Sequence, residues 1–309
     1  MKIVAVIVTR GRTDLLAACL AAVLGQSRAV DLAVVVDNND DPAVCAALRE
    51  RHAADDRVRF YQTEANLGGA GGFAAGIRLA LHHGADQVWL MDDDVLPAAD
   101  ALGRLVATHD HFAPILPLGF VCSRVVWTDG SAAEMNRSTP QADWDRWYSA
   151  DWPVASVQTA TFVSLLLPRE VILRKGLPAA AFFIWYDDND YTLRITADMV
   201  GLCALSSVAV HRMAVNAGAD FRAVTAANLW KYRYGVRNEI ATVRTHFGLA
   251  AAAMAAMRLC RRVATAPGLA AKLALAAALV RGFIFRYEME MYDPARAFTR
   301  IRTGPPRPL

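Results

Sequence analysis

The sequence lacks the cysteine pattern of a zinc ribbon or a disulfide-bonded scaffold. Its five cysteines are scattered through 309 residues and form no Cys-x-x-Cys pair. An odd number of widely spaced cysteines favours free thiols in a reducing compartment. The first apolar run, Ile3–Val8, is too short for the hydrophobic core of a signal peptide. We therefore expect a cytoplasmic protein.

A large excess of charge of either sign is also missing. Thirty-three Lys and Arg against thirty Asp and Glu leave a net charge of +3, so the composition does not support a nucleic-acid-binding protein. The Gly-x-Ser-x-Gly and His-Glu-x-x-His motifs are absent, which argues against two common classes of hydrolase. With 55% hydrophobic residues, the chain can form a sizeable core and is not expected to be disordered.

Apolar runs alternate with helical patterns over the first ninety residues. Predicted strands are Ile3–Val8, Leu32–Val36, Val58–Gln62 and Gln87–Met91, and predicted helices are Thr13–Gln26, Pro42–His52 and Ala70–His83. This alternation is typical of an α/β fold with a mostly parallel central sheet flanked by helices.

Polar residues follow three of these predicted strands. They are Thr9-Arg10, Asp37-Asn38 and Asp92–Asp94. The ligand of a parallel sheet usually lies beyond the carboxyl ends of the strands. We therefore expect these residues to form one shared site.

The strongest local signal is Asp92-Asp93-Asp94. Adjacent carboxylates repel one another, which indicates a compensating cation. On an extended chain Asp92 and Asp94 point to one side and Asp93 to the other, and two carboxylate oxygens suit Mn²⁺ or Mg²⁺. A solvated acidic turn is the alternative. A lone histidine such as His211 is more often structural, yet imidazole is a suitable third ligand for an ion of this kind.

Four glycines, Gly68, Gly69, Gly71 and Gly72, lie in the segment Asn66–Phe73 before a predicted helix. Such residues let the backbone approach a ligand and expose amides at a helix start. A tight turn explains them equally well. The spacing matches neither the Gly-x-Gly-x-x-Gly motif nor a loop that ends in Gly-Lys-Ser/Thr.

A second acidic cluster, Asp187-Asp188-Asn189-Asp190, follows the bulky segment Phe182–Tyr186. Carboxylates beside apolar groups can have a raised proton affinity and act as a general base. The same acidic residues suit the N-terminus of a helix, predicted here at Tyr191–Val200, and both interpretations can hold. Five of the seven tryptophans lie between residues 112 and 215, where they could stack on a sugar or simply pack.

After about residue 224 the sequence is helical and rich in alanine, so we divide the chain at 1–223 and 224–309. Much of the mean hydropathy of +0.23 lies in 247–285, which has no acidic residue. Basic residues and Pro267-Gly268 interrupt this segment, so no stretch approaches the roughly 20 residues of a membrane span. We expect either an interfacial amphipathic segment attracted to anionic lipid or a helical hairpin that packs internally or in a homodimer.

Taken in order, the motifs resemble the family 2 glycosyltransferases, which have the GT-A fold, use nucleotide sugars and invert the anomeric configuration. The strings Asn66–Phe73, Trp89–Asp94 and Phe183–Tyr191 are similar to those of the galactofuranosyltransferases of bacterial cell-wall synthesis. The resemblance covers roughly residues 1–240. It implies transfer of galactofuranose from UDP-galactofuranose to a lipid-linked or polysaccharide acceptor, with Mn²⁺ or Mg²⁺ as cofactor.

The resemblance also implies roles for individual residues. The donor would be bound by Thr9, Arg10, Asp37, Asn38, Asn66, Gly68, Gly69, Gly71, Gly72, Asp92, Asp93, Arg237 and Asn238. The metal ligands would be Asp92, Asp94 and His211, and the acceptor would contact Trp185 and Tyr186. Asp188 would be the catalytic base and Asp187 would orient the acceptor, although Tyr186 separates Trp185 from this pair and leaves the choice between the two carboxylates open. The lack of an N-terminal β-domain favours an enzyme that adds one or two residues.

Three alternatives stay open at this point. A rhamnosyltransferase that uses dTDP-rhamnose has a similar glycine segment and Tyr-x-x-Arg-Asn element. A nucleotidyltransferase needs a basic glycine-rich signature, of which Thr9–Arg12 is a faint version. A non-catalytic nucleotide-sugar-binding or lectin-like module would be expected to lack the base or the metal ligands.

Overall fold

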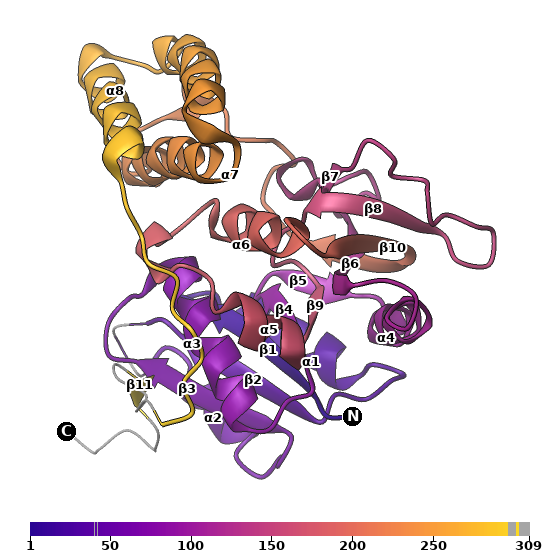
Figure 1. Cartoon of the computed structure of the whole chain (residues 1–309). Helices are drawn as coiled ribbons and strands as arrows, with labels where there is room; N and C mark the ends of the chain where they lie inside the picture. Colours follow the sequence, from indigo (N-terminus) through magenta and orange to yellow (C-terminus); the bar gives the residue numbers. More distant parts are fainter. Residues whose placement is uncertain (40, 42, 296–300, 303–309) are drawn as a thin grey trace.

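The fold is seen in a computed structural model that describes residues 1–39, 41, 43–295 and 301–302. One mixed sheet crosses the molecule in the order β11-β3-β2-β1-β4-β9-β6-β10-β8-β7, with β5 paired to β10 (Figure 1). Its N-terminal half contains β1 (Ile3–Thr9), β2 (Leu32–Asp37), β3 (Val58–Thr63) and β4 (Gln87–Asp92). These four strands are parallel, as predicted.

The other half of the sheet differs from the prediction of mostly parallel strands. It contains β5 (Val95–Pro97), β6 (Leu118–Val126), β7 (Thr139–Pro140), β8 (Val154–Thr159), β9 (Leu165–Pro168) and β10 (Val200–His211). Strand β9 is antiparallel to β4 and β6, and β10 is parallel to β6 but antiparallel to β5 and β8. Irregular segments join several of these strands, and antiparallel pairing needs no crossover helix.

Helices cover both faces of the sheet. They are α1 (Thr13–Leu24), α2 (Ala46–Arg51), α3 (Gly68–His82), α4 (Ala101–Phe112), α5 (Arg169–Lys175) and α6 (Asp187–Thr196). Val4, Val6 and Val8 of β1 face a core with α3, α5 and α6. The alternate side chains of β1 face a second core with α1, α2 and α4. Burial on both faces explains why this strand is a continuous apolar run.

The starts of three helices differ from the prediction. Helix α2 is shorter than Pro42–His52, since its first turn begins at Ala46. Helix α3 begins at Gly68, so the predicted glycine loop is its first turn. Helix α6 spans Asp187–Thr196 instead of Tyr191–Val200, because Val200 already belongs to strand β10.

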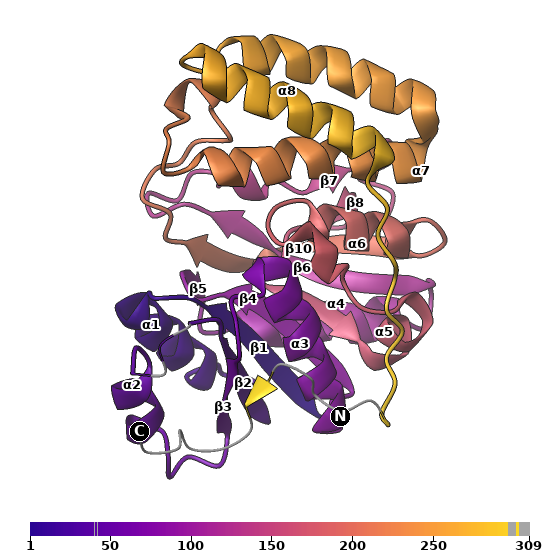
Figure 2. The same ribbon diagram turned by 90° about the vertical axis from the view of Figure 1, so that its left-hand side faces the viewer.

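The C-terminal helices form a separate layer, which Figure 2 shows beyond one end of the sheet. Helix α7 (Leu229–Ala264) is broken at Gly248, where φ is 85°, and is followed by α8 (Leu269–Ile284). The two parts of α7 share one hydrophobic cluster with α8. This cluster contains Phe221 as well as Val224 and so includes residues on both sides of residue 223. The division of the chain at that residue remains a prediction.

Among the described residues, α7 is the one helix that is long and apolar enough to cross a membrane, judged by length and composition. This differs from the expectation that no stretch would reach that length. Gly248 nevertheless interrupts the helix near its middle. After α8, residues 285–295 run back past α5 and α3 (Figure 1). The short strand β11 (Ile301–Arg302) pairs with β3.

Candidate active site

The register of the sheet brings the predicted polar clusters to one edge. Thr9 at the end of β1 is the partner of Asp37 at the end of β2, and Val8 is the partner of Asp92. On the other side, His211 at the end of β10 pairs with Val95, one residue after the aspartate triplet. The structure therefore places these strand ends next to one another, and that they form one shared site remains a prediction.

Asp92, Asp94 and His211 could hold a divalent cation. One ligand atom from each of the three lies within 4.8 Å of the other two. His211 Nε2 is 3.0 Å from Asp94 Oδ1, and its Nδ1 is 2.6 Å from Asn136 Oδ1, which orients the ring. Two carboxylates and one imidazole suit Mn²⁺, so this residue set fits the predicted metal. Its role as a metal site remains a prediction.

Arg12 already compensates part of the charge on the aspartate triplet. Its guanidinium pairs with Asp93 and donates to Asp94 Oδ2 at 2.5 Å. Asp93 is completely buried and also accepts a hydrogen bond from Thr9 Oγ1 at 2.6 Å. Asp93 and Thr9 thus bind each other, and a direct contact of either with a donor remains a prediction.

The pKa values of Asp92 and Asp94 are shifted in opposite directions. Burial and the charge of Asp94 raise the pKa of Asp92. Burial alone would raise the pKa of Asp94 too, but hydrogen bonds from His211 and Arg12 outweigh it and the pKa is lowered. Asp94 is therefore the carboxylate whose charge is already stabilised by the protein.

Asp37 and Asn38 occupy the end of β2, where the resemblance places the nucleotide. Asp37 is completely buried, and its Oδ1 accepts from the backbone of Asn39 at 3.0 Å. Its Oδ2 lies 3.6 Å from Arg49 Nη2, and neither atom has a hydrogen bond within the described chain. Such buried unsatisfied groups are consistent with a missing polar ligand. Asn38 instead donates to Gly68 O at 2.9 Å.

The glycines of the first turn of α3 serve close packing. A Cβ at Gly68, where φ is +69°, would lie 2.0 Å from Phe183 O, and a Cβ at Gly72 would lie 2.6 Å from Val8. At Gly71 the nearest atom would be Leu67 Cβ, whereas Gly69 faces open space. Asn66 accepts a hydrogen bond from Gly68 N at 2.9 Å. Of the four glycines, Gly69 therefore has most room for a ligand.

The turn before the second acidic cluster has an unusual backbone. Phe183, Trp185 and Tyr186 all have φ between 64° and 70°, a region that bulky residues rarely adopt. Asn238, which is completely buried, donates from Nδ2 to the carbonyls of Phe182, Ile184 and Trp185 at 2.8 to 3.0 Å. Strain of this kind persists only where surrounding contacts fix it, and it concentrates at functional sites.

Arg237 supports the same turn. Its Nη2 donates to Ala181 O at 2.9 Å, and its Nε donates to Asn238 Oδ1 at 2.8 Å. In this structure Arg237 and Asn238 therefore position the turn, and their predicted contact with the donor remains untested. Trp185 packs on Tyr232, with ring centroids 5.4 Å apart. Trp185 is only partly buried and keeps surface for the predicted acceptor contact.

Asp187 and Asp188 form the first turn of α6. Burial and the neighbouring charge of Asp188 raise the pKa of Asp187. Burial raises the pKa of Asp188 to about 6, although hydrogen bonds from Asn189 to its Oδ1 act in the opposite direction. Asp188 is the more exposed of the two. A partly accessible carboxylate with a pKa near neutrality is suited to general base catalysis.

Residues 4–151 match the model of glycosyl transferase family 2. This segment, just under half of the chain, is therefore similar to a family 2 glycosyltransferase domain. This match includes the glycines and the aspartate triplet but ends before Asp187.

Curated relatives are similar to part of the chain. The galactofuranosyltransferase GlfT1 of Mycolicibacterium smegmatis is 42% identical over 122 residues, which are 38% of this chain and 39% of that protein. GlfT1 of Mycobacterium tuberculosis is 45% identical over 94 residues, or 30% of each chain. The aligned segments thus span well under half of these relatives.

Solved structures share the fold. GalNAc-T7, crystallised with UDP, GalNAc and Mn²⁺, superposes with a TM-score of 0.59 at 12% identity, over 79% of this chain and 48% of that one. S. aureus TarS has a TM-score of 0.51 at 14% identity, over 86% and 44%. The chain therefore has the GT-A fold, as the sequence predicts.

Two residues of the site are missed by the sequence analysis. The first is Arg12, although its place in Thr9–Arg12 next to a strand end is a usable signal. The second is Asp190, which accepts hydrogen bonds from Arg194, His246 and Tyr287. Asp190 thereby joins α6 of the sheet unit to the C-terminal helices, a role that no local motif indicates.

Proposed function

We propose that this chain is an inverting glycosyltransferase that transfers galactofuranose from UDP-galactofuranose to a glycan acceptor. The observation that carries the proposal is the convergence of Asp92, Asp94 and His211 at the strand ends of a chain similar to family 2 glycosyltransferases. The similarity to proteins named galactofuranosyltransferase supports this choice of sugar.

In the proposed reaction, Asp188 accepts the proton of an acceptor hydroxyl while the hydroxyl oxygen attacks the anomeric carbon. The bond from that carbon to the diphosphate oxygen breaks, and UDP leaves with the bonding electron pair. A divalent cation held by Asp92, Asp94 and His211 would neutralise charge on the leaving diphosphate. Because attack occurs opposite the leaving group, one displacement inverts the anomeric configuration.

The experiment is a donor panel. The protein is incubated with Mn²⁺ and with UDP-galactofuranose, other UDP-sugars or dTDP-rhamnose, and release of the nucleoside diphosphate is followed. We expect UDP release from UDP-galactofuranose above the rate without enzyme. Preference for dTDP-rhamnose would establish the rhamnosyltransferase instead. Release of pyrophosphate would indicate a nucleotidyltransferase, and binding without release would indicate a non-catalytic module.

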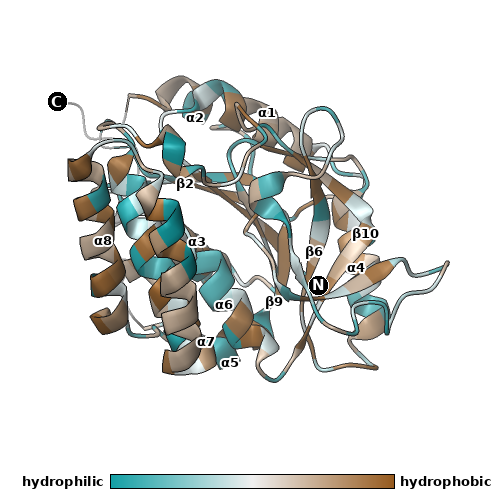
Figure 3. Ribbon diagram, turned by 90° about the horizontal axis from the view of Figure 1, so that it is seen from above, coloured by the Kyte–Doolittle hydropathy of each residue, from teal (hydrophilic) through white to brown (hydrophobic). Residues whose placement is uncertain are grey.

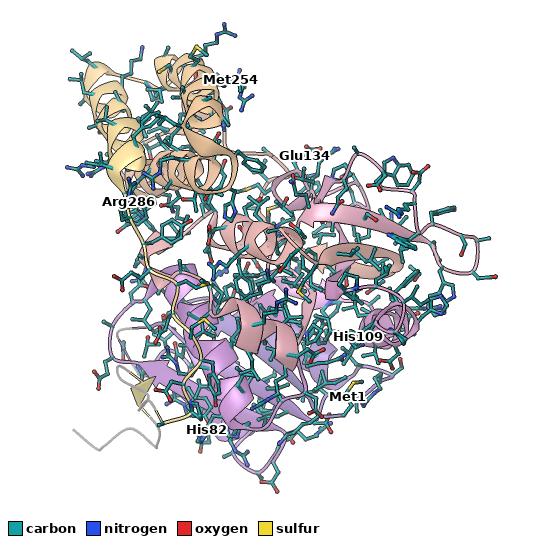
Figure 4. The ribbon with its side chains drawn as sticks, in the orientation of Figure 1. Met1, His82, His109, Glu134, Met254 and Arg286 are labelled. Carbon is teal, nitrogen blue, oxygen red and sulfur yellow. The ribbon has the colours of Figure 1, made fainter. Side chains whose placement is uncertain are left out.

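We further infer that the acceptor is lipid-linked and that the C-terminal helices rest on an anionic membrane surface. Only 28% of the most apolar window of α7 is buried. Met254, Met257, Leu273 and Ile284 are each more than half exposed. Figure 3 shows hydrophobic residues along α8 on the outer side of the molecule, and Figure 4 shows Met254 on the side of α7 away from the sheet.

Basic residues on the same helices suit anionic lipid. Arg258 and Arg261 lie four and seven residues after Met254 on α7, and Lys272 precedes Leu273 on α8. Apolar side chains next to basic ones are typical of interfacial helices. Sedimentation with vesicles should show more binding to phosphatidylcholine containing phosphatidylglycerol than to phosphatidylcholine alone. A dimer in solution without vesicle binding would assign this face to a homodimer instead.

A further inference from the structure

A cavity of about 350 Å³ lies between α7 and α8, outside the strand-end site. It is lined by Trp230, Arg233, Tyr234, Arg237, Ala278 and Arg281. The four residues from α7 follow one another at spacings of three, one and three, so they occupy one face of the helix. The volume lies in the range of small-molecule pockets.

The lining carries three guanidinium groups and no carboxylate. The side chains of Arg233 and Arg281 form no hydrogen bond and no ion pair with any described part of the chain. Arg262 of the same helix, in contrast, pairs with Glu239 at 3.7 Å. Neighbouring like charges are unfavourable unless an anion lies between them, and guanidinium groups bind phosphate oxygens in bidentate geometry.

Aromatic rings hold the third arginine in place. The Arg237 guanidinium lies 4.8 Å from the centre of the Tyr234 ring and 3.9 Å from that of Phe285. Its hydrogen bonds to the Phe182 region fix it further. One cation of the cavity is thus preorganised, while the other two are free to close on a ligand.

The cavity lies between the turn that leads to Asp188 and the exposed apolar face of α8. On one side, Tyr234 stacks on Phe183 with ring centroids 5.0 Å apart, and Phe183 belongs to the turn that leads to Asp188. On the other side, Arg281 lies one residue from Val280 and three from Ile284, which are 63% and 72% exposed. A ligand in the cavity would therefore be close to both the acceptor turn and the apolar outer face.

We propose that the cavity between α7 and α8 binds the phosphate or diphosphate group of the lipid carrier to which the acceptor is attached. This proposal rests on the proposed glycosyltransferase function with a lipid-linked acceptor. The phosphate lies against Arg233, Arg237 and Arg281, the apolar chain leaves past Val280 and Ile284 toward the membrane, and the sugar extends past Phe183 toward Asp188.

The test measures binding of farnesyl diphosphate to the full chain by calorimetry in the presence of EDTA. Without a divalent ion, binding at the metal-dependent donor site is suppressed. The pocket variant is Arg233→Gln/Arg281→Gln, and the matched control is Arg258→Gln/Arg261→Gln, which removes the same charge from exposed positions on α7 outside the cavity. Melting temperatures check that both variants fold.

We expect the pocket variant to bind farnesyl diphosphate at least about tenfold more weakly than wild type, since charge-assisted hydrogen bonds are lost. The control should change the affinity by less than about twofold. UDP binding with Mn²⁺ should be unchanged in the pocket variant. If both variants lose affinity for farnesyl diphosphate equally, the effect is non-specific electrostatic attraction and the proposal is wrong. Loss of UDP binding in the pocket variant would also overturn the proposal.

A vesicle experiment separates two sources of phosphate. If the pocket variant binds vesicles containing phosphatidylglycerol less well but binds farnesyl diphosphate normally, the ligand is a membrane headgroup and the acceptor assignment is wrong. If the proposed glycosyltransferase function is wrong, the result is different. In that case UDP-galactofuranose is not turned over, while the difference between the two variants in diphosphate binding persists.

Discussion

The two aspartate clusters have similar sequences but opposite surroundings. In the first, at the end of β4, the carboxylates of Asp93 and Asp94 pair with Arg12, and Asp94 also bonds to His211. In the second, at the start of α6, the described residues provide no ion pair to Asp187 or Asp188, and Asp190 is the member that pairs with a cation, Arg194.

This difference separates two kinds of chemistry. Cations beside Asp94 keep it ionised, which is what a metal ligand requires. Burial without a cation raises the pKa of both Asp187 and Asp188, which is what a proton acceptor requires. Asp94 and Asp188 therefore differ because hydrogen bonds and cations outweigh burial at Asp94, whereas burial dominates at Asp188.

The largest expected effect is that of removing the proton acceptor. Asp188→Asn should lower turnover by about 10²–10⁴-fold, because base catalysis contributes this much, and it should leave UDP binding with Mn²⁺ nearly unchanged. Asp187→Asn is the matched variant and should have a smaller effect. Turnover and UDP titration check both. If Asp187→Asn is the more damaged enzyme, the base is Asp187.

Removing the imidazole should act on the first cluster only. His211→Ala should weaken Mn²⁺ binding by at least about tenfold, since loss of even an orienting partner of a metal ligand costs about 10–100-fold. UDP-dependent thermal shifts at increasing Mn²⁺ concentration measure this. Partial recovery of turnover at high Mn²⁺ is expected for His211→Ala and not for Asp188→Asn. Unchanged Mn²⁺ dependence would contradict the metal assignment.

The dependence of turnover on pH should reflect the protonation of Asp188 in the second cluster. Asp188 acts as a base only when unprotonated, and burial raises its pKa to about 6. Turnover at saturating substrate should therefore be constant above that pH and fall about tenfold per pH unit below it. The Asp188→Asn enzyme should not show this acid limb. An acid limb that persists in Asp188→Asn would assign the titration to another group.

The smallest effect on turnover is expected when Asn238, which holds the turn before Asp188, is replaced. Asn238→Ala removes the side-chain amide donor shared by three carbonyls near Asp188 and should lower the free energy of unfolding by about 1–3 kcal/mol. Because the residue positions the turn, KM for the acceptor should rise while UDP affinity stays near wild type. Denaturant unfolding and steady-state kinetics measure the two effects. A change in UDP affinity without a change in acceptor KM would place Asn238 at the donor.

The sequence predicts the parallel half of the sheet because strands buried on both faces are continuous apolar runs. Parallel strand ends then gather Asp37 and Asp92 at one edge, whatever the details of the loops. The antiparallel half has no such pattern, since short strands such as β9 depend on which neighbour they pair with. For this reason the sequence pattern does not predict the short strands between residues 112 and 215.

The candidate site divides in the same way. Asp92, Asp94 and His211 are predicted from residue chemistry and strand ends, and the structure brings them together. The roles of Asn238 and Asp190 depend on contacts between segments more than fifty residues apart. No local pattern encodes such contacts, so they appear only once the C-terminal helices are placed.

The contact between Gly68 and Phe183 has a consequence for how the two substrates affect each other's affinity. Ala70 N donates to Phe183 O at 3.2 Å. The two segments lie so close together that a Cβ atom at Gly68 would clash with Phe183 O. A donor that shifts the first turn of α3 must therefore shift the turn before Asp188 as well. Because such coupling is reciprocal, each substrate should change the affinity for the other by the same factor, which titration of each substrate with and without the other would measure.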